Sequence, residues 1–499
     1  MAVAVAFIMA WDRVAVEQER APEAAALAVL AGFRADVYWS FTRRADALFE
    51  LCDAVLCAPG RVTDLARLSL AAEFRRGHGA LYDALNCGHA GFSRLRRALA
   101  GLPLPAWDDG RIRLAVDVSH WLRPDARASP ERLLCAVKGR GKNAAAQPVP
   151  GWPCSFVAAL GPGRSSWTLP LDAARLGPDD DECLVTAAQL RDVVTQLTAA
   201  GQWEPGDPEI IIAADAGYNA TRLAFLLEDL PVIIVARVRA DRVFWAPAPP
   251  RVPGKAGHPA RHGPPVRCAD PATQGSPPLE GRGRDARHGP LAVAAWPRVH
   301  QKVHRNTAGF GDWPPGRPFP AVEGTLVRLQ VTRPQAKPMW LWASAPDPGG
   351  DLVAVLWQAY LRRFDIEHTF RFFKQQLGWT RPLLRDPAAA DLWTWLVVAA
   401  YAQLWIARKI AAVACLPWQR RPPEPGAVTP GQARAGFRRA REIAGTPASP
   451  AKPAGPGPGR PKGSKNKRKA PRQPVGKPKH KPSTQRTQAS RARKQKQPG

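Results

Sequence analysis

The sequence lacks the cysteine patterns of a disulfide-bonded or zinc-binding protein. Its 499 residues include eight cysteines, but no C-x-x-C pair and no Cys/His cluster with the spacing of zinc ligands. Such a distribution supports neither a disulfide framework nor a structural zinc site. It fits a reducing compartment, and we expect the protein in the cytoplasm.

A secretory signal and a membrane span are also missing from the pattern. The apolar start MAVAVAFIMA has no basic region and no cleavage site, and it is too short to cross a bilayer. A longer apolar stretch begins at Leu392, but it contains Gln403 and ends in Arg408 and Lys409. We interpret it as a buried helix, with a membrane span as the alternative, and expect no membrane partner.

Acidic residues are scarce, and the end of the chain has none. The sequence holds 71 Lys and Arg against 42 Asp and Glu, a net charge of +29. Residues 451–499 contain 16 of the basic residues and no acid, and the preceding 450 residues carry the remaining +13. A chain that is basic throughout indicates a polyanionic partner such as nucleic acid. Solubility or an anionic membrane surface would explain the charge less specifically.

Aromatic residues nearly vanish after residue 417, where Pro, Gly, Lys, Arg, Gln and Ser dominate. Such a composition cannot build a core, so we expect residues 418–499 to form a disordered basic tail. Within it, Gly459-Arg460-Pro461 is similar to the core of an AT-hook, which inserts Arg into a narrow A·T minor groove. Non-specific phosphate contact is the alternative. Both interpretations make Arg460 and Lys462 candidates for DNA contact.

The beginning of the chain is expected to be helical. A length of 499 residues indicates several domains. Helical patterns cover residues 20–100, with Thr63 as an expected N-cap. Arg75 and Arg76, near a turn, fit a helix-turn-helix, and an ordinary helical bundle is the alternative. We assign residues 1–105 to a helical region that is expected to bind DNA.

Strand patterns begin at residue 111 and predict an α/β fold. Apolar strand-like runs and helical runs over residues 110–240 indicate a mixed sheet with flanking helices. Residues 241–345 begin with a long stretch rich in Pro, Gly, Arg and His before two further strands, so we assign them to an insertion subdomain. Residues 346–417 are expected to be the final helices of this core.

Two acidic residues end apolar strands. Asp117 ends IRLAVD and Asp215 ends IIIAAD. A carboxylate at such a position is costly unless something compensates its charge. If the two strands are adjacent, both acids point into one crevice; an N-cap or a salt bridge is the alternative role. Other acids lie in loops or at polar helix positions and rank lower: Asp125, Asp179, Asp180, Asp181, Asp229 and Asp365.

The segment YLRRFDIEHTFRFFKQQLGW, residues 360–379, contains four residues that share one helix face. At 100° per residue, their offsets of 0, 3, 7 and 14 fall within about 60° of one another. Arg371 lies close to this stripe, which consists of Tyr360, Arg363, Glu367 and Lys374. A solvated face with salt bridges is the alternative interpretation. With Glu367 on a helix that covers the crevice, three carboxylates would meet, and hard oxygen ligands select Mg²⁺ or Mn²⁺.

Together these residues resemble the DDE transposases of bacterial insertion sequences that carry the Y-x2-R-x3-E-x6-K signature. The likeness covers residues 110–410: Asp117 on a first strand, Asp215 in D-A-G-Y, and the stripe at its full spacing. The gap of 152 residues between the second and third acids is similar to that of relatives with an inserted β-domain. The resemblance implies an RNase H-like core with an insertion before the last catalytic helix, and dependence on Mg²⁺ or Mn²⁺.

The resemblance also implies roles for single residues. Asp117, Asp215 and Glu367 would be the catalytic metal ligands. Tyr360, Arg363 and Lys374, joined by Arg371, would contact DNA phosphates, for which a guanidinium fork, an ammonium and a hydroxyl are suitable donors. Gly217 and Tyr218 match the turn after the second acid.

The expected activity is Mg²⁺-dependent cleavage and transfer of DNA strands at the terminal inverted repeats of an insertion sequence. The expected partners are double-stranded DNA, as transposon ends and as target, and a second copy of the chain, because the chemistry acts on two ends. The protein would then associate with the nucleoid. Three alternatives are an inactive DNA-binding relative, an RNase H-like nuclease without strand transfer, and nucleoid packing through the tail alone.

Overall fold

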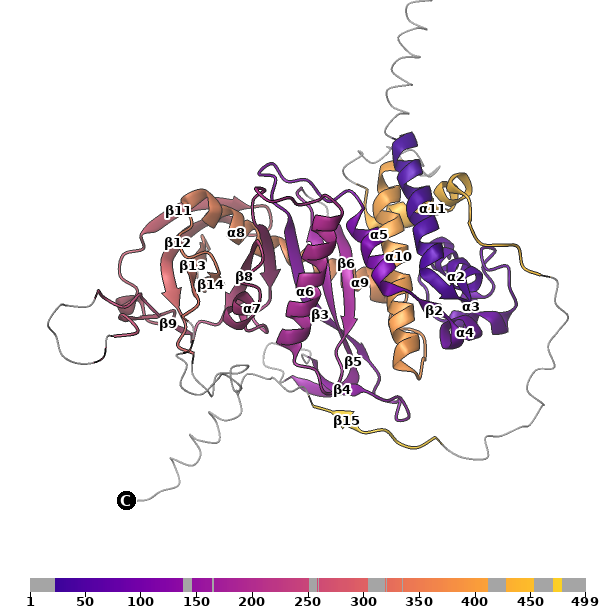
Figure 1. The fold of residues 1–499 in the computed structure, drawn as a ribbon, viewed down its shortest axis with the longest axis horizontal. Helices are drawn as coiled ribbons and strands as arrows, with labels where there is room; N and C mark the ends of the chain where they lie inside the picture. The colour runs from indigo at the N-terminus through magenta and orange to yellow at the C-terminus, as the bar shows by residue number, and fades with distance from the viewer. Residues whose placement is uncertain are drawn as a thin grey trace, which may run out of the picture.

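The computed structural model describes most of the chain. The described residues are 23–137, 146–163, 166–250, 258, 260–303, 319, 321–333, 335–411, 428–452 and 470–477. The molecule is elongated, with a β-rich end, a central sheet covered by helices, and a helical end (Figure 1).

A mixed sheet runs through the middle of the molecule. Its central strands follow the order β6-β5-β3-β7-β8. β3 is antiparallel to β5 and parallel to β7, and β7 is parallel to β8. Apolar runs such as IIIAA in β7 are buried on both faces, as expected for central parallel strands. The bounds are β3 Arg113–Leu122, β5 Gln147–Leu160, β6 Thr168–Arg175, β7 Ile210–Ala214 and β8 Val232–Val238.

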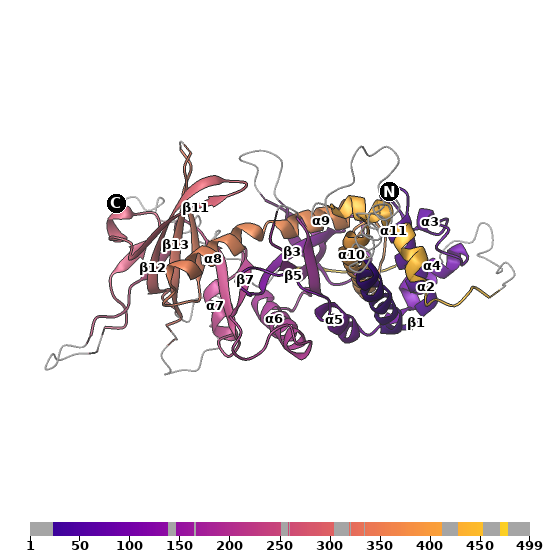
Figure 2. The same ribbon diagram turned by 90° about the horizontal axis from the view of Figure 1, so that it is seen from above.

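Helices cover both faces of this sheet (Figure 2). On one face, α8 (Gly350–Arg362) and α9 (Asp365–Gln375) follow each other end to end. The other face carries α5 (Phe92–Ala100), α6 (Glu182–Ala199) and α7 (Ala220–Leu226). The expected mixed α/β class is confirmed, and the topology is consistent with an RNase H-like fold.

The segment assigned to an insertion forms strands that continue the central sheet. Its strand β14 pairs antiparallel with β8, and β13 pairs with β14. The expectation of few strands before residue 325 was wrong, because β11 and β12 form a hairpin there. The alternating Gly and Arg of LEGRGRD in β11 hide the strand pattern, since this edge strand is mostly exposed. The bounds are β9 Val243–Trp245, β10 Pro265–Arg267, β11 Leu279–Asp285, β12 Gly289–His300, β13 Glu323–Val331 and β14 Met339–Ala343.

The helical end brings together helices from the early and late described parts of the chain. The helix over residues 23–40 and α2 (Ala45–Cys57) pack with α10 (Pro387–Ala411) and α11 (Pro430–Ala444). Buried Arg34 donates to Asp53 at 2.8 Å and to Gln403 at 2.7 Å, and so ties three of these segments together. The described residues 23–105 therefore pack directly against α10 and α11.

The expected tail boundary at residue 418 needs correction. α11 begins with a capping box at Thr429, and its Phe437 is fully buried in the helical end. Further on, β15 (Val475–Gly476) pairs in parallel with the edge strand β4 (Arg132–Val137). Arginine and alanine dominate α11, and its buried apolar residues are only Ala433, Phe437 and Ala440, so the average composition of the region conceals the helix.

In the described part of the chain, the segment around Arg75 and Arg76 packs within the helical end. α3 (Leu65–Leu68) has only four residues, and its N-cap is Asp64 instead of Thr63. Arg75 donates to the buried Glu50 at 2.9 Å, and Arg76 lies 3.3 Å from the same carboxylate. These arginines therefore stabilise the packing of the bundle. The remaining short elements are α4 (His78–Cys87) and the two-stranded sheet of β1 (Phe41–Arg43) and β2 (His89–Ala90).

One described helix is long and apolar enough to cross a membrane by length and composition. This segment, Pro387–Ile410, lies in α10, and 94% of its apolar 18-residue window is buried inside the molecule. Trp393 and Tyr401 are fully enclosed. The interpretation of this stretch as a buried helix agrees with that packing.

Candidate active site

Two neighbouring parallel strands bring Asp117 and Asp215 to the same edge of the sheet. Val116 of β3 pairs in register with Ala214 of β7, so the next position on each strand is an acid. The Asp117 side chain is 13% exposed, whereas the Asp215 side chain is 46% exposed at the start of the turn after β7. The predicted convergence of these two acids is present in the structure.

Arg363 contacts both acids. Its Nη1 donates to Asp117 Oδ2 at 2.6 Å, and its Nη2 lies 3.5 Å from Asp215 Oδ1. The Arg363 side chain is 10% exposed and therefore compensates two carboxylates at a site with little water. Burial favours a lower pKa for Arg363, but the two carboxylates outweigh it and raise the pKa.

Asp117 has a perturbed acidity. Burial raises its pKa to about 6, and the charges of Glu367 and Asp215 act in the same direction, while Arg363 opposes them. The backbone N–H of Val118 also donates to Asp117 Oδ1 at 2.8 Å. At neutral pH the side chain is therefore a carboxylate held by one cation and one amide, with two further negative charges nearby.

Glu367 and Lys374 lie on α9 beyond a break in the predicted helix. Arg363 N–H donates to Tyr360 O and Glu367 N–H donates to Phe364 O, both at 3.1 Å, which is the i to i−3 pattern of a 3₁₀ turn. Glu367 is exposed, and its charge adds to the rise in the pKa of Asp117 that burial causes, so the third acid lies within electrostatic range of the first. Burial lowers the pKa of Lys374, and Glu367 opposes this shift. The stripe is thus kept despite the break.

The other predicted contact residues differ in position. Tyr360 is buried; burial raises its pKa, and its ring centre lies 5.8 Å from the Arg363 guanidinium. Arg371 is exposed on α9, where its charge lowers the pKa of His368 after the effect of burial. Arg460 and Lys462 lie outside the described residues.

One acid near the site was not predicted. Glu182, the first residue of α6, has a pKa raised to about 7 by burial and by the charges of Asp117 and Asp181. Tyr218, in the turn after Asp215, places its hydroxyl in the same region, since both Asp117 and Glu182 raise its pKa after burial. In the sequence, Glu182 only continues an acidic run, and no local pattern shows that this helix end faces β3.

Two of the three candidate acids, Asp117 and Asp215, lie close enough to each other to share a hard divalent cation. Asp117 and Asp215 have oxygens within 3.5 Å of one guanidinium, which stands here for a shared cation. No group of three His, Cys, Asp or Glu side chains in the described part of the chain is close enough to hold a metal ion. Metal binding by all three acids therefore requires that Arg363 leave and that Glu367 approach.

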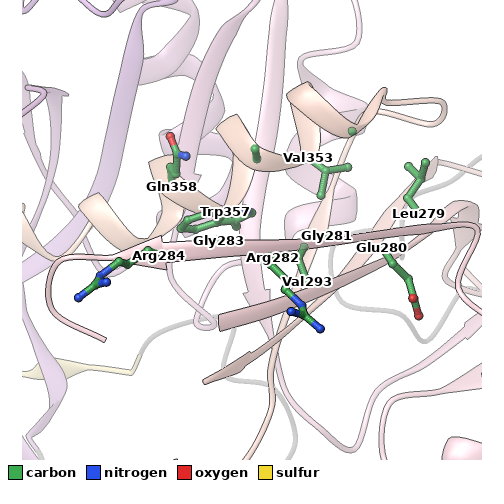
Figure 3. Close-up of a pocket in the computed structure, with 12 residues that line it drawn as sticks. Leu279, Glu280, Gly281, Arg282, Gly283, Arg284, Val293, Val353, Trp357 and Gln358 are labelled. Carbon is green, nitrogen blue, oxygen red and sulfur yellow. The ribbon is translucent and has the colours of Figure 1, made fainter. Parts of the chain in front are cut away.

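A separate cavity of about 210 Å³ lies between β11 and α8 (Figure 3). Trp357 of α8 packs between that helix and β11, and a Cβ on Gly283 would come within 2.6 Å of its ring. The catalytic candidates do not line this cavity. It marks where the insertion contacts the helix that leads to Arg363.

Comparison with known proteins identifies the family of this chain. A family model described as DDE superfamily endonuclease matches residues 36–302. The chain belongs to the DDE superfamily endonucleases. Membership supports a nuclease or transposase type of enzyme that acts on DNA, in a superfamily that generally uses divalent metals. No curated protein matches the chain.

The family match covers two of the three acids of this DDE superfamily endonuclease. Asp117 and Asp215 lie inside residues 36–302, and Glu367 lies beyond them. The choice of Glu367 as the third acid therefore depends on its spacing in the signature and on its electrostatic coupling to Asp117.

Proposed function

We propose that this protein is the transposase of a bacterial insertion sequence, which cleaves DNA at the terminal inverted repeats of its element and joins the ends to target DNA. One observation carries the proposal. Asp117 and Asp215, 98 residues apart in the chain, contact one guanidinium from the helical segment that also bears Glu367. Three charged groups from separate parts of the chain thus meet at one edge of the sheet. The protein that carries them is basic overall.

The side chains present can divide the chemistry among them. Asp117, Asp215 and Glu367 would hold Mg²⁺ or Mn²⁺, which when bound activates the attacking hydroxyl and stabilises the leaving oxygen. Lys374, Tyr360 and Arg363 would bind the phosphates beside the scissile bond and orient the strand.

Neutral substitution of each acid tests the proposal. We expect Asp117→Asn, Asp215→Asn and Glu367→Gln to reduce DNA cleavage by at least about 10³-fold, because each removes negative charge that the metal site needs. DNA binding, measured by fluorescence anisotropy, should change little. Glu228→Gln, at an exposed acid beside α7, is the matched control and should cleave normally. Full cleavage by any of the three variants removes that acid from the site.

A strand-transfer assay separates the proposal from its rivals. A precleaved duplex with the sequence that flanks the coding region should be joined to target DNA in Mg²⁺. An RNase H-like nuclease would cut without yielding joined product, and an inactive relative would bind without cutting. Matched inverted repeats on both sides of the coding region would independently support a mobile element.

The proposal extends to partners and location. Two DNA ends must be processed together, so we propose a homodimer on DNA, which sedimentation of the protein with end duplex would reveal. Arg460 and Lys462 would add phosphate or minor-groove contacts, and the protein would act in the cytoplasm at the nucleoid.

A further inference from the structure

Arg363 occupies the position between two acids that a metal ion would need. Its guanidinium contacts Asp117 at 2.6 Å and Asp215 at 3.5 Å. A guanidinium and a divalent cation compete for the same carboxylate oxygens, because each carboxylate oxygen has few lone pairs to share. The two cannot both be fully bound to these acids.

The contacts that hold Arg363 between the two acids differ in length. The Asp117 contact is short, but the Asp215 contact is long, and Arg363 Nε is buried with no hydrogen-bond partner in the described part of the chain. An unpartnered buried donor costs free energy, which lowers the barrier to a different arrangement. Arg363 also lies at the break between α8 and α9, where the backbone turns from α to 3₁₀ hydrogen bonding.

We propose that Arg363 gates metal binding: it is the counter-cation of Asp117 and Asp215 in the DNA-free enzyme, and a DNA phosphate draws it away. This inference rests on the proposed function for the identity of the anion. Release of the guanidinium frees both carboxylates for the metal, so DNA and metal bind with positive coupling. By reciprocity, metal binding strengthens DNA binding by the same factor. Metal-dependent hydrolysis is thereby suppressed until a DNA strand is bound.

Metal affinity without DNA tests the gate. Binding of Mn²⁺ to the full chain can be followed through the electron paramagnetic resonance signal of free Mn²⁺. We expect Arg363→Gln to bind Mn²⁺ about tenfold more tightly than the wild type, within the usual range of coupling between sites. Arg371→Gln removes the same charge from an exposed position on α9. It should change Mn²⁺ affinity less than about twofold, because water and salt screen the charge of an exposed side chain.

The coupling itself gives the second measurement. With a precleaved end duplex, the wild type should gain Mn²⁺ affinity, and Arg363→Gln should gain about tenfold less, since its acids are already free. Arg363→Lys retains a positive charge but not the planar guanidinium, so its gain in Mn²⁺ affinity should lie between those of the wild type and Arg363→Gln. This variant replaces Arg363→Gln in the experiment if the Gln variant fails to fold. Equal Mn²⁺ affinity of the wild type and both variants without DNA overturns the gate.

The outcomes distinguish the gate from the proposed function. Wild-type strand cleavage together with an unchanged Mn²⁺ affinity in the Arg363 variants would leave the transposase proposal standing and refute the gate. Conversely, tighter Mn²⁺ binding by Arg363→Gln, without cleavage or strand transfer by the wild type, would support the gate and refute the transposase.

Discussion

At the scale of single residues, the candidate active site contains buried acids whose ionisation is unfavourable. Asp117 and Glu182 are both acids whose burial raises the pKa, and the charge of Asp117 adds to the shift of Glu182. Arg363 relieves Asp117 directly, whereas Glu182 has no ion pair or hydrogen bond among the described contacts that would relieve it. Glu182 should therefore make the fold less stable at the pH at which it ionises.

The sign of this effect gives a pH prediction. The pKa of Glu182 rises from its ordinary 4.5 to about 7 on folding, so the folded state loses stability as pH increases from 4.5 to about 7. Glu182→Gln removes the ionisable group. We expect the variant to match the wild type near pH 4 and to exceed it at pH 8, by at most about 3 kcal/mol. Denaturant unfolding at both pH values measures the difference, and an equal difference at both would contradict the burial of a charged Glu182.

At the scale of elements, α11 decides where the folded protein ends. Its buried face contributes Phe437 to the helical end, and its Arg434 donates to the carbonyl oxygen of Val55 at 2.9 Å. Arg441 adds a second cation to the buried Asp53 at 2.8 Å. The helix thus provides a donor for the Val55 carbonyl near the end of α2 and adds to the compensation of Asp53, which Arg34 also contacts.

Truncation of one side chain of α11 tests this role. We expect Phe437→Ala to lower the free energy of unfolding by about 3–5 kcal/mol, because the ring fills a fully buried site. Arg439→Ala, at an exposed position of the same helix, should stay within about 0.5 kcal/mol of the wild type. Thermal or denaturant unfolding compares the two. Equal stability of both variants would show that α11 is not part of the core.

At the scale of the whole molecule, positive charge extends over the body and the end of the chain. Removal of residues 478–499, which carry seven Lys and Arg, should weaken DNA binding and flatten its dependence on salt. Each lost phosphate contact reduces the slope of log affinity against log salt by about 0.9 on duplex DNA. Binding titrations over a range of salt concentrations measure the slope, and a tail of the same residues in shuffled order is the control. An unchanged slope after truncation would exclude DNA contact by this segment.

The sequence predicted much of the site because its signals are local. The short apolar runs LAV in β3 and IIIAA in β7 identify these strands, and the acid that follows each run is visible without any tertiary information. The stripe from Tyr360 to Lys374 follows from helical periodicity. Whether that stripe faces the acids is not a local property, and neither is the contact of Glu182 with the same region.

The sequence by itself determined the α/β class, the central strands and helices, the acidic strand ends and the basic character, because each depends on the order of near neighbours. The tertiary structure alone decided that the insertion continues the sheet, that α11 joins the first helices, and that Arg363 lies between Asp117 and Asp215. Arg363 and Asp117 are 246 residues apart. Such a pairing depends on strand register, helix packing and the need to compensate a buried charge, and none of these is written in a short stretch of chain.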